Sequence, residues 1–196
     1  MGIKPIDNIN RPVPHIVSQG ANDMTIKPVI ELKNIKHTAW MSEETHCYQA
    51  TLYVDGVKWG IVSNAGHGGC DDFYGEARSD DDIKELNKRI AETYKPYTFG
   101  DGNDEVMLGA VPRSINQDLD MVCADLVNQW LRDKDFNRAM NAKVLFTKPD
   151  TQGIWQLAVK KPLTLEVMLA KLKAINPQYT YLADLPVDEA KAIYFA

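Results

Sequence analysis

Hydrophobic and polar positions alternate over several short segments of the chain. Residues 29–37, 47–54 and 57–63 have the alternation, and the β-branched and aromatic residues, that are typical of strands. The last two segments are separated only by Asp55-Gly56, and this pair favours a tight hairpin turn because both of its positions need positive φ. Together the three segments predict an antiparallel meander.

Other segments follow a helical period. Ser79 is placed to cap a helix over residues 80–90, whose aspartates lie in the first turn, where the helix dipole favours them. A longer amphipathic helix is predicted from Ser114 or Asn116 to about Leu131. The remaining expected elements are a short strand within 106–108, a hairpin of 143–147 and 154–159, helices over 164–173 and 186–194, and a short strand within 179–182.

This order of elements predicts an α+β fold, with an antiparallel sheet built from the three-strand meander and the later hairpin and covered by several helices. Residues 1–27 contain proline and glycine without apolar periodicity, which predicts a flexible or irregular N-terminal arm. A chain of 196 residues is long enough for one substantial core. We therefore expect residues 28–196 to form a single domain.

Charge narrows the possible functions. The net charge is −5, and residues 71–125 hold fourteen acidic side chains against six basic ones. No basic stripe is present, which argues against nucleic-acid binding. No apolar run approaches the roughly 18–20 residues that cross a bilayer, and the N-terminus has no secretory pattern. With three widely spaced cysteines, the sequence predicts a cytoplasmic protein with reduced thiols.

The most unusual segment is the turn Asn64-Ala65-Gly66-His67-Gly68-Gly69-Cys70-Asp71-Asp72. Its glycines could present N–H groups to an anion, although the lysine of a phosphate loop is missing. A zinc site is another interpretation, with His46, His67, Cys70 and Asp71 as the ligands. A Cys70 nucleophile is a third, but the adjacent aspartates would raise the pKa of its thiol. The favoured interpretation is a structural turn in which Asn64 and Asp71 bond local groups and Cys70 packs as a small apolar residue. No cofactor is expected.

Acidic and aromatic side chains also gather around the first helix. Exposed aromatic residues beside charges commonly anchor protein interfaces. On this basis the candidate partner-binding residues are Asp80, Asp81, Asp82, Tyr94, Tyr97 and Phe99.

Three stretches carry a resemblance to known proteins: residues 32–48, residues 64–70 and the closing Ala183-Asp184-Leu185-Pro186-Val187-Asp188-Glu189-Ala190. They resemble small uncharacterised accessory proteins of bacteriophages and other bacterial mobile elements. The resemblance covers about a third of the chain and implies no activity and no functional residue. It implies a setting in a bacterial host cell, where small accessory proteins often bind and block host machinery, including defence systems.

The sequence thus favours a non-enzymatic interaction protein that inhibits a host defence protein by binding its basic surface. The alternative is a small hydrolase or nuclease, or a metal- or ligand-binding protein, centred on His67, Cys70 and Asp71. The sequence leaves the oligomeric state open.

Overall fold

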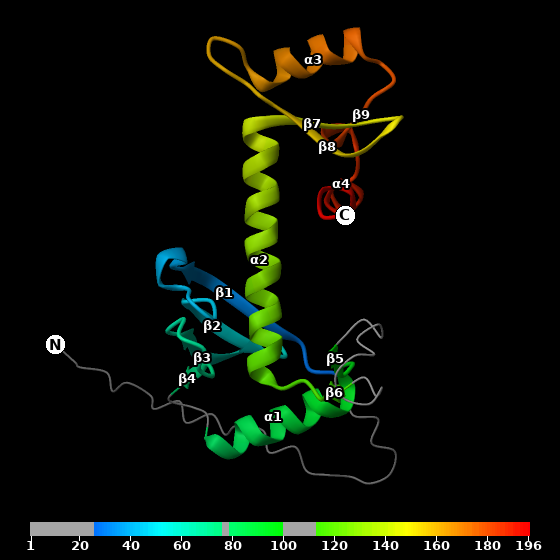
Figure 1. The fold of residues 1–196 in the computed structure, drawn as a ribbon. Helices are drawn as coiled ribbons and strands as arrows, with labels where there is room; N and C mark the ends of the chain where they lie inside the picture. The colour runs from blue at the N-terminus through cyan, green and yellow to red at the C-terminus, as the bar shows by residue number, and fades with distance from the viewer. Residues whose placement is uncertain (1–25, 76–78, 100–112) are drawn as a thin grey trace, which may run out of the picture.

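The computed structural model describes residues 26–75, 79–99 and 113–196. The elements in order are β1 Ile30–His37, η1 Ala39–Met41, β2 Tyr48–Val54, β3 Val57–Asn64, β4 Asp72–Tyr74, α1 Asp80–Thr93, β5 Tyr97–Phe99, β6 Arg113–Ile115, α2 Leu119–Ala142, β7 Lys143–Lys148, β8 Thr151–Ala158, α3 Leu165–Ile175, β9 Thr180–Tyr181, η2 Leu182–Asp184 and α4 Val187–Tyr194. The long helix α2 has the four-stranded sheet and α1 around its first half (Figure 1). The second sheet, α3 and α4 lie around its other end.

The predicted meander is confirmed. Strands β1, β2 and β3 pair antiparallel in sequence order, and the hairpin turn holds Asp55 and Gly56 at φ of 51° and 77°. A fourth strand, β4, pairs with β3 and was not predicted. Its three residues follow the glycine-rich turn directly, and so short a segment has no periodicity of its own.

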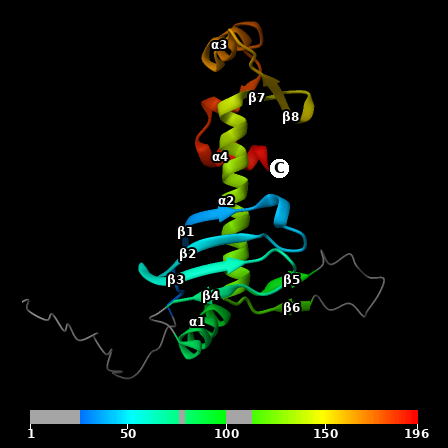
Figure 2. The same ribbon diagram turned by 90° about the vertical axis from the view of Figure 1, so that its left-hand side faces the viewer.

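One face of the four-stranded sheet is buried. Tyr48, Ala50, Leu52 and Val54 alternate inward along β2, as a half-buried strand requires. They pack in one cluster with Leu86 and Ile90 of α1 and with Leu119, Val122, Cys123 and Val127 of α2. In Figure 2 the four strands cross in front of α2. The helix therefore covers the sheet with its first half only.

Helix α2 differs from the prediction at both ends. It begins at Leu119 because Asp118 caps it, with its Oδ1 accepting the N–H of Met121 at 2.9 Å. Residues 113–115 instead form β6, which pairs with β5. The helix continues to Ala142, past the predicted end at Leu131, because its last turns enter a second core.

That second core contains Phe136 and Ala139 of α2 together with Leu145, Leu182 and Ala190. The predicted hairpin is confirmed as β7 and β8, although its loop is shorter than expected and consists of the two turn residues 149–150. Strand β9 pairs with the other side of β7, so this three-stranded sheet has the order β8-β7-β9. Helix α3 packs on one of its faces, against Val144 and Phe146.

The α+β prediction is therefore confirmed, with the meander and the later hairpin in two separate antiparallel sheets. Residues 1–25 of the predicted arm, and the strand expected within 106–108, lie outside the described residues. The single-domain assignment of 28–196 stays a prediction. Among the described helices, none combines the length and apolar character that a bilayer crossing requires.

Candidate functional site

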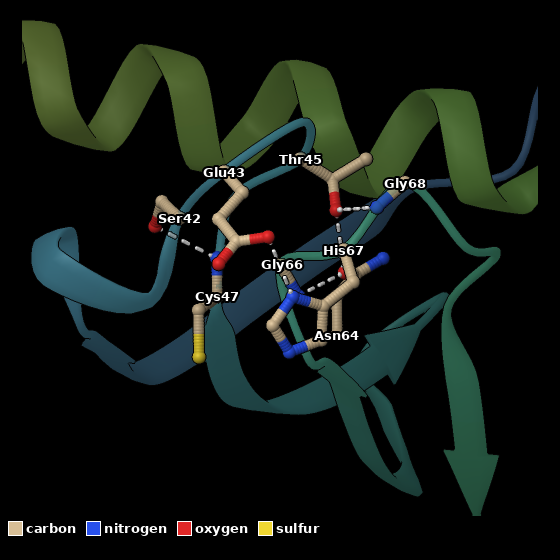
Figure 3. A network of polar contacts seen from close by, with 8 residues as sticks. All are labelled: Ser42, Glu43, Thr45, Cys47, Asn64, Gly66, His67 and Gly68. Carbon is tan, nitrogen blue, oxygen red and sulfur yellow. Dashed lines mark hydrogen bonds and ion pairs between the residues drawn. The ribbon is translucent and has the colours of Figure 1, made fainter.

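Asn64 organises the glycine-rich turn between β3 and β4. It is a buried polar residue, and its Oδ1 accepts hydrogen bonds from Thr45 Oγ1 and the N–H of Gly66, both at 2.8 Å. Its Nδ2 donates to the carbonyl of Gly69 and to Asp71 Oδ1, both at 2.9 Å. One side chain thus ties the start, middle and end of the turn together. Figure 3 shows its contacts with Thr45 and Gly66.

Gly66 joins this turn to the loop that precedes β2. Its carbonyl accepts the N–H groups of Glu43, Glu44 and Thr45 at 2.9, 3.1 and 3.4 Å. Its φ is 92°, and a Cβ at this position would lie 2.2 Å from the carbonyl oxygen of Met41. Only glycine fits here, so the structural role predicted for this turn is present in the geometry.

The anion-binding interpretation has little support from this geometry. The N–H of Gly66 already bonds Asn64 Oδ1, and the N–H of Gly68 bonds Thr45 Oγ1 at 3.3 Å. These amides are therefore occupied within the protein and do not form an open ring of donors.

The two histidines among the four predicted metal ligands have separate partners. His67 Nδ1 lies 3.2 Å from Glu43 Oε2, and His46 Nε2 lies 2.8 Å from Asn128 Oδ1. Across residues 26–75, 79–99 and 113–196, no group of three or more histidine, cysteine, aspartate or glutamate side chains is arranged to hold a metal ion. His46, Cys70 and Asp71 line one cleft, but they are not arranged to hold a metal ion, and His67 is not among the residues that line it.

A cleft lies between the same turn and the start of α2. It has a volume of about 330 Å³. Its lining residues are Thr45, His46, Tyr48, Asn64, Gly68, Gly69, Cys70, Asp71, Asp118, Asp120, Met121 and Ala124. Three of them are aspartates, and none is a lysine or an arginine. The cleft is therefore a concave acidic surface.

Asp71 is a half-buried residue in the lining of this cleft. Its Oδ2 accepts the Tyr48 hydroxyl at 2.5 Å, and its N–H donates to Asp120 Oδ2 at 3.3 Å. Burial raises the pKa of Asp71, the hydrogen bonds from Tyr48 and Asn64 oppose that rise, and the charge of Asp120 adds to it. The carboxyl is held in place while its negative charge is poorly solvated.

Asp120 faces Asp71 from the first turn of α2. Burial is the main cause that raises its pKa, the N–H of Asp71 opposes the rise, and the charge of Asp118 adds to it. Two neighbouring carboxyls in one cleft thus both favour their protonated forms more than an exposed aspartate does. A cationic group placed between the two carboxyls would stabilise their ionised forms, and their negative charges would hold that group in place.

Cys70 lies at the rim of the cleft. Its side chain is exposed, so the expectation that it packs as an apolar residue is wrong. The hydrogen bond to Asp120 is the main cause that raises the pKa of the Cys70 thiol, and the charges of Asp120, Asp118 and Asp71 contribute. The direction agrees with the sequence argument, although the main cause comes from α2 and not from the adjacent aspartates. A raised pKa favours the protonated thiol, which is a poor nucleophile.

The candidate partner-binding residues lie at the two ends of α1, which is about 21 Å long at 1.5 Å per residue. Asp82 closes a capping box with Ser79, whereas Asp80 and Asp81 are exposed. Tyr94, at the other end, packs partly against the core and donates to the carbonyl of Pro28 at 3.0 Å. The ammonium of Lys27 lies 3.8 Å from the centre of its ring. Tyr97 and Phe99 follow in β5, and Tyr97 is 47% exposed.

Sequence reasoning missed Asp118 and Asp120. Both lie at the start of a helix, where acidic residues are ordinary capping and dipole partners. The available signal was Asp-Leu-Asp at the first turn of the longest amphipathic segment, but nothing local indicates that this turn faces residues 68–71. Comparison with known proteins adds no further assignment: no protein-family model, curated protein or solved structure matches the chain.

Proposed function

We propose that this chain is a non-enzymatic accessory protein of a bacteriophage or mobile element, which binds a basic surface of a host defence protein in the bacterial cytoplasm and inhibits it. The setting comes from the resemblance described above. The acidic cleft carries the binding part of the proposal. It presents Asp71, Asp118 and Asp120 in a concave surface without a lysine or arginine in its lining.

The chemistry of the cleft favours a cationic side chain as the inserted group. A lysine ammonium or an arginine guanidinium would be attracted by all three carboxylates and would find hydrogen-bond acceptors on them. A cavity of about 330 Å³ accommodates one such side chain and leaves no room for a large ligand. Exposed Asp80 and Asp81 would extend the acidic field that steers a basic partner toward the protein.

The first test is binding of short lysine- and arginine-containing peptides, measured by fluorescence anisotropy at low and high salt. Asp118→Asn/Asp120→Asn should weaken binding roughly tenfold to a hundredfold. Asparagine is as good a helix cap as aspartate, so α2 should keep its start. The matched control is Glu85→Gln/Glu189→Gln, which removes the same charge at exposed positions outside the cleft. Equal weakening by the two double variants would mean that only net acidity matters, and the cleft would lose its assigned role.

The second test identifies the partner. The wild-type protein and the Asp118→Asn/Asp120→Asn variant are used to retain proteins from bacterial lysate, and candidates are then purified and tested for direct binding. We expect a basic host protein that binds the wild type, is released by salt, and loses activity when bound. A partner that is retained equally at low and high salt, and equally by the wild type and the double variant, would contradict the electrostatic mechanism.

A second candidate function is supported by the raised pKa of Asp71 and of Asp120. Two such carboxyls in one cleft could act as general acid and base in a small hydrolase. Cys70 would not be the nucleophile, because its pKa is raised. A panel of ester, phosphodiester and glycoside substrates tests this candidate. Activity that disappears in Asp71→Asn, and not in Asp80→Asn, would replace the binding proposal with an enzymatic one.

A further inference from the structure

Trp40 is the most exposed large apolar side chain in the part of the chain that the structure describes, at 84%. The rings of Trp130 and Trp155 each lie beside a lysine ammonium, at 4.8 and 3.6 Å from the ring centre. The ring of Trp40 has neither a cation nor an aromatic ring against it within residues 26–75, 79–99 and 113–196. It is therefore accessible to a group from a partner.

The loop that carries Trp40 is fixed on both sides of this residue. Ser42 Oγ donates to the carbonyl of Thr38 at 3.0 Å and accepts the N–H of Cys47 at 2.9 Å (Figure 3). The N–H of Thr38 donates to the carbonyl of Cys47, also at 2.9 Å. Trp40 itself lies in the short helix η1 between these contacts. Because the loop is already ordered, binding at Trp40 does not have to order its backbone.

The same loop leads from Trp40 to the acidic cleft. Thr45 and His46 belong to the lining of the cleft. Thr45 follows Trp40 by five positions, so the two Cα atoms are at most about 18 Å apart. Between them, the carboxylate of Glu44 occupies the space that a Cβ on Gly68 would need, and Gly68 also lines the cleft. The acidic surface of the cleft therefore continues toward Trp40.

The charges around Trp40 favour a cationic group over an apolar one. Residues 39–46 contain two glutamates and no lysine or arginine. Glu43 and Glu44 are exposed, although Glu43 Oε2 lies 3.2 Å from His67 Nδ1. The face of an indole ring attracts cations through its quadrupole, and nearby carboxylates strengthen that attraction. An arginine guanidinium can also stack on the ring. The loop thus offers the same preference for a cation as the cleft.

We propose that Trp40 is a second contact point for the basic partner. Its indole ring receives an arginine or lysine head group, while another cationic side chain of the same partner enters the cleft. The inference rests on the proposed function of the cleft and adds a requirement to it. The partner must present two cationic groups, which in an extended segment lie no more than about six residues apart.

The test is the binding of labelled synthetic peptides, measured by fluorescence anisotropy at low salt. One set carries two arginines joined by neutral spacers of about two to six residues. In matched peptides, norleucine replaces one arginine or the other. Trp40→Leu should raise the dissociation constant of the best two-arginine peptide roughly threefold to tenfold and leave that of the norleucine peptides unchanged. Trp155→Leu makes the same substitution at a partly exposed tryptophan of the second sheet and should leave all of them unchanged.

The remaining outcomes separate this inference from the function of the cleft. If Trp40→Leu binds every two-arginine peptide as tightly as the wild type while Asp118→Asn/Asp120→Asn weakens binding, the inference is overturned and the cleft keeps its role. If Trp40→Leu weakens the norleucine peptides equally, Trp40 makes an apolar contact and the cationic assignment is overturned. If Asp118→Asn/Asp120→Asn binds the peptides like the wild type, the proposed function fails and this inference fails with it.

Discussion

Replacing Asn64 with alanine is the sharpest test of how the glycine-rich turn is held. Asn64 is 8% exposed, and its amide makes four hydrogen bonds, to Thr45, Gly66, Gly69 and Asp71. Alanine keeps the backbone of β3 and removes all four. The substitution therefore tests the side-chain hydrogen bonds while the backbone pairing of the sheet is kept.

The size of the effect follows from how each partner is placed. Gly66 is buried, so its N–H would be left without an acceptor, which costs about 1–3 kcal/mol. The hydroxyl of Thr45, the carbonyl of Gly69 and the carboxylate of Asp71 are at least partly accessible and can bond water instead. Their loss adds less than a full hydrogen bond each. We expect Asn64→Ala to lower the free energy of unfolding by about 3 kcal/mol.

The assay is urea unfolding followed by tryptophan fluorescence, with the slope of the transition compared between variants. Ser63→Ala is the matched control, since Ser63 is the preceding residue of the same strand and is only partly buried. Asn64→Asp keeps the acceptor for Gly66 but places a second carboxylate against Asp71. The Asn64→Asp variant should therefore be destabilised most at neutral pH. The destabilisation should fall at lower pH, where the introduced carboxyl binds a proton that it can donate. A loss of under about 1 kcal/mol for Asn64→Ala would refute the reasoning.

Three further outcomes are expected. Gly66→Ala should destabilise the protein by more than about 2 kcal/mol, because its Cβ would meet Met41, whereas Gly69→Ala should be nearly neutral because a Cβ there meets nothing within 4 Å. Thermal unfolding of the two variants side by side checks this. Cys70 should react with iodoacetamide more slowly than an unhindered thiol at neutral pH. Asp120→Asn should speed the reaction, because it removes the main cause of the raised pKa of the Cys70 thiol. Equal rates in the wild type and in Asp120→Asn would contradict that cause. Asp120→Asn should also stabilise the fold at neutral pH and lose this advantage in acid, since a carboxyl of raised pKa opposes folding only when it is charged; urea unfolding at several pH values measures it.

Much of the fold follows from local rules that act over a few residues. The Asp55-Gly56 turn fixes a hairpin because few other residue pairs adopt its two positive φ values. The cap at Ser79 and the periodicity after it define α1, which forms with the predicted start and extends three residues further. The period-2 alternation of β2 identifies its buried face without knowledge of what covers it.

The errors arose where distant contacts outweighed local pattern. The charged run after Leu131 looks like the end of a helix, but Phe136 and Ala139 continue α2 because they pack into the second core. Strand β4 exists only because β3 offers an edge to it. Neither outcome has a signal within its own segment.

The sequence indicates a turn over residues 64–72, because its glycines allow backbone conformations that a continuous strand does not use. It also showed that the middle of the chain is acidic. Asp118 and Asp120 of α2 face that turn although they lie 47 and 49 residues after Asp71 along the chain, and this placement depends on the tertiary structure. The physical reason is that burial and neighbouring charge are set by the packing of α2 against the sheet, and no local pattern contains that information.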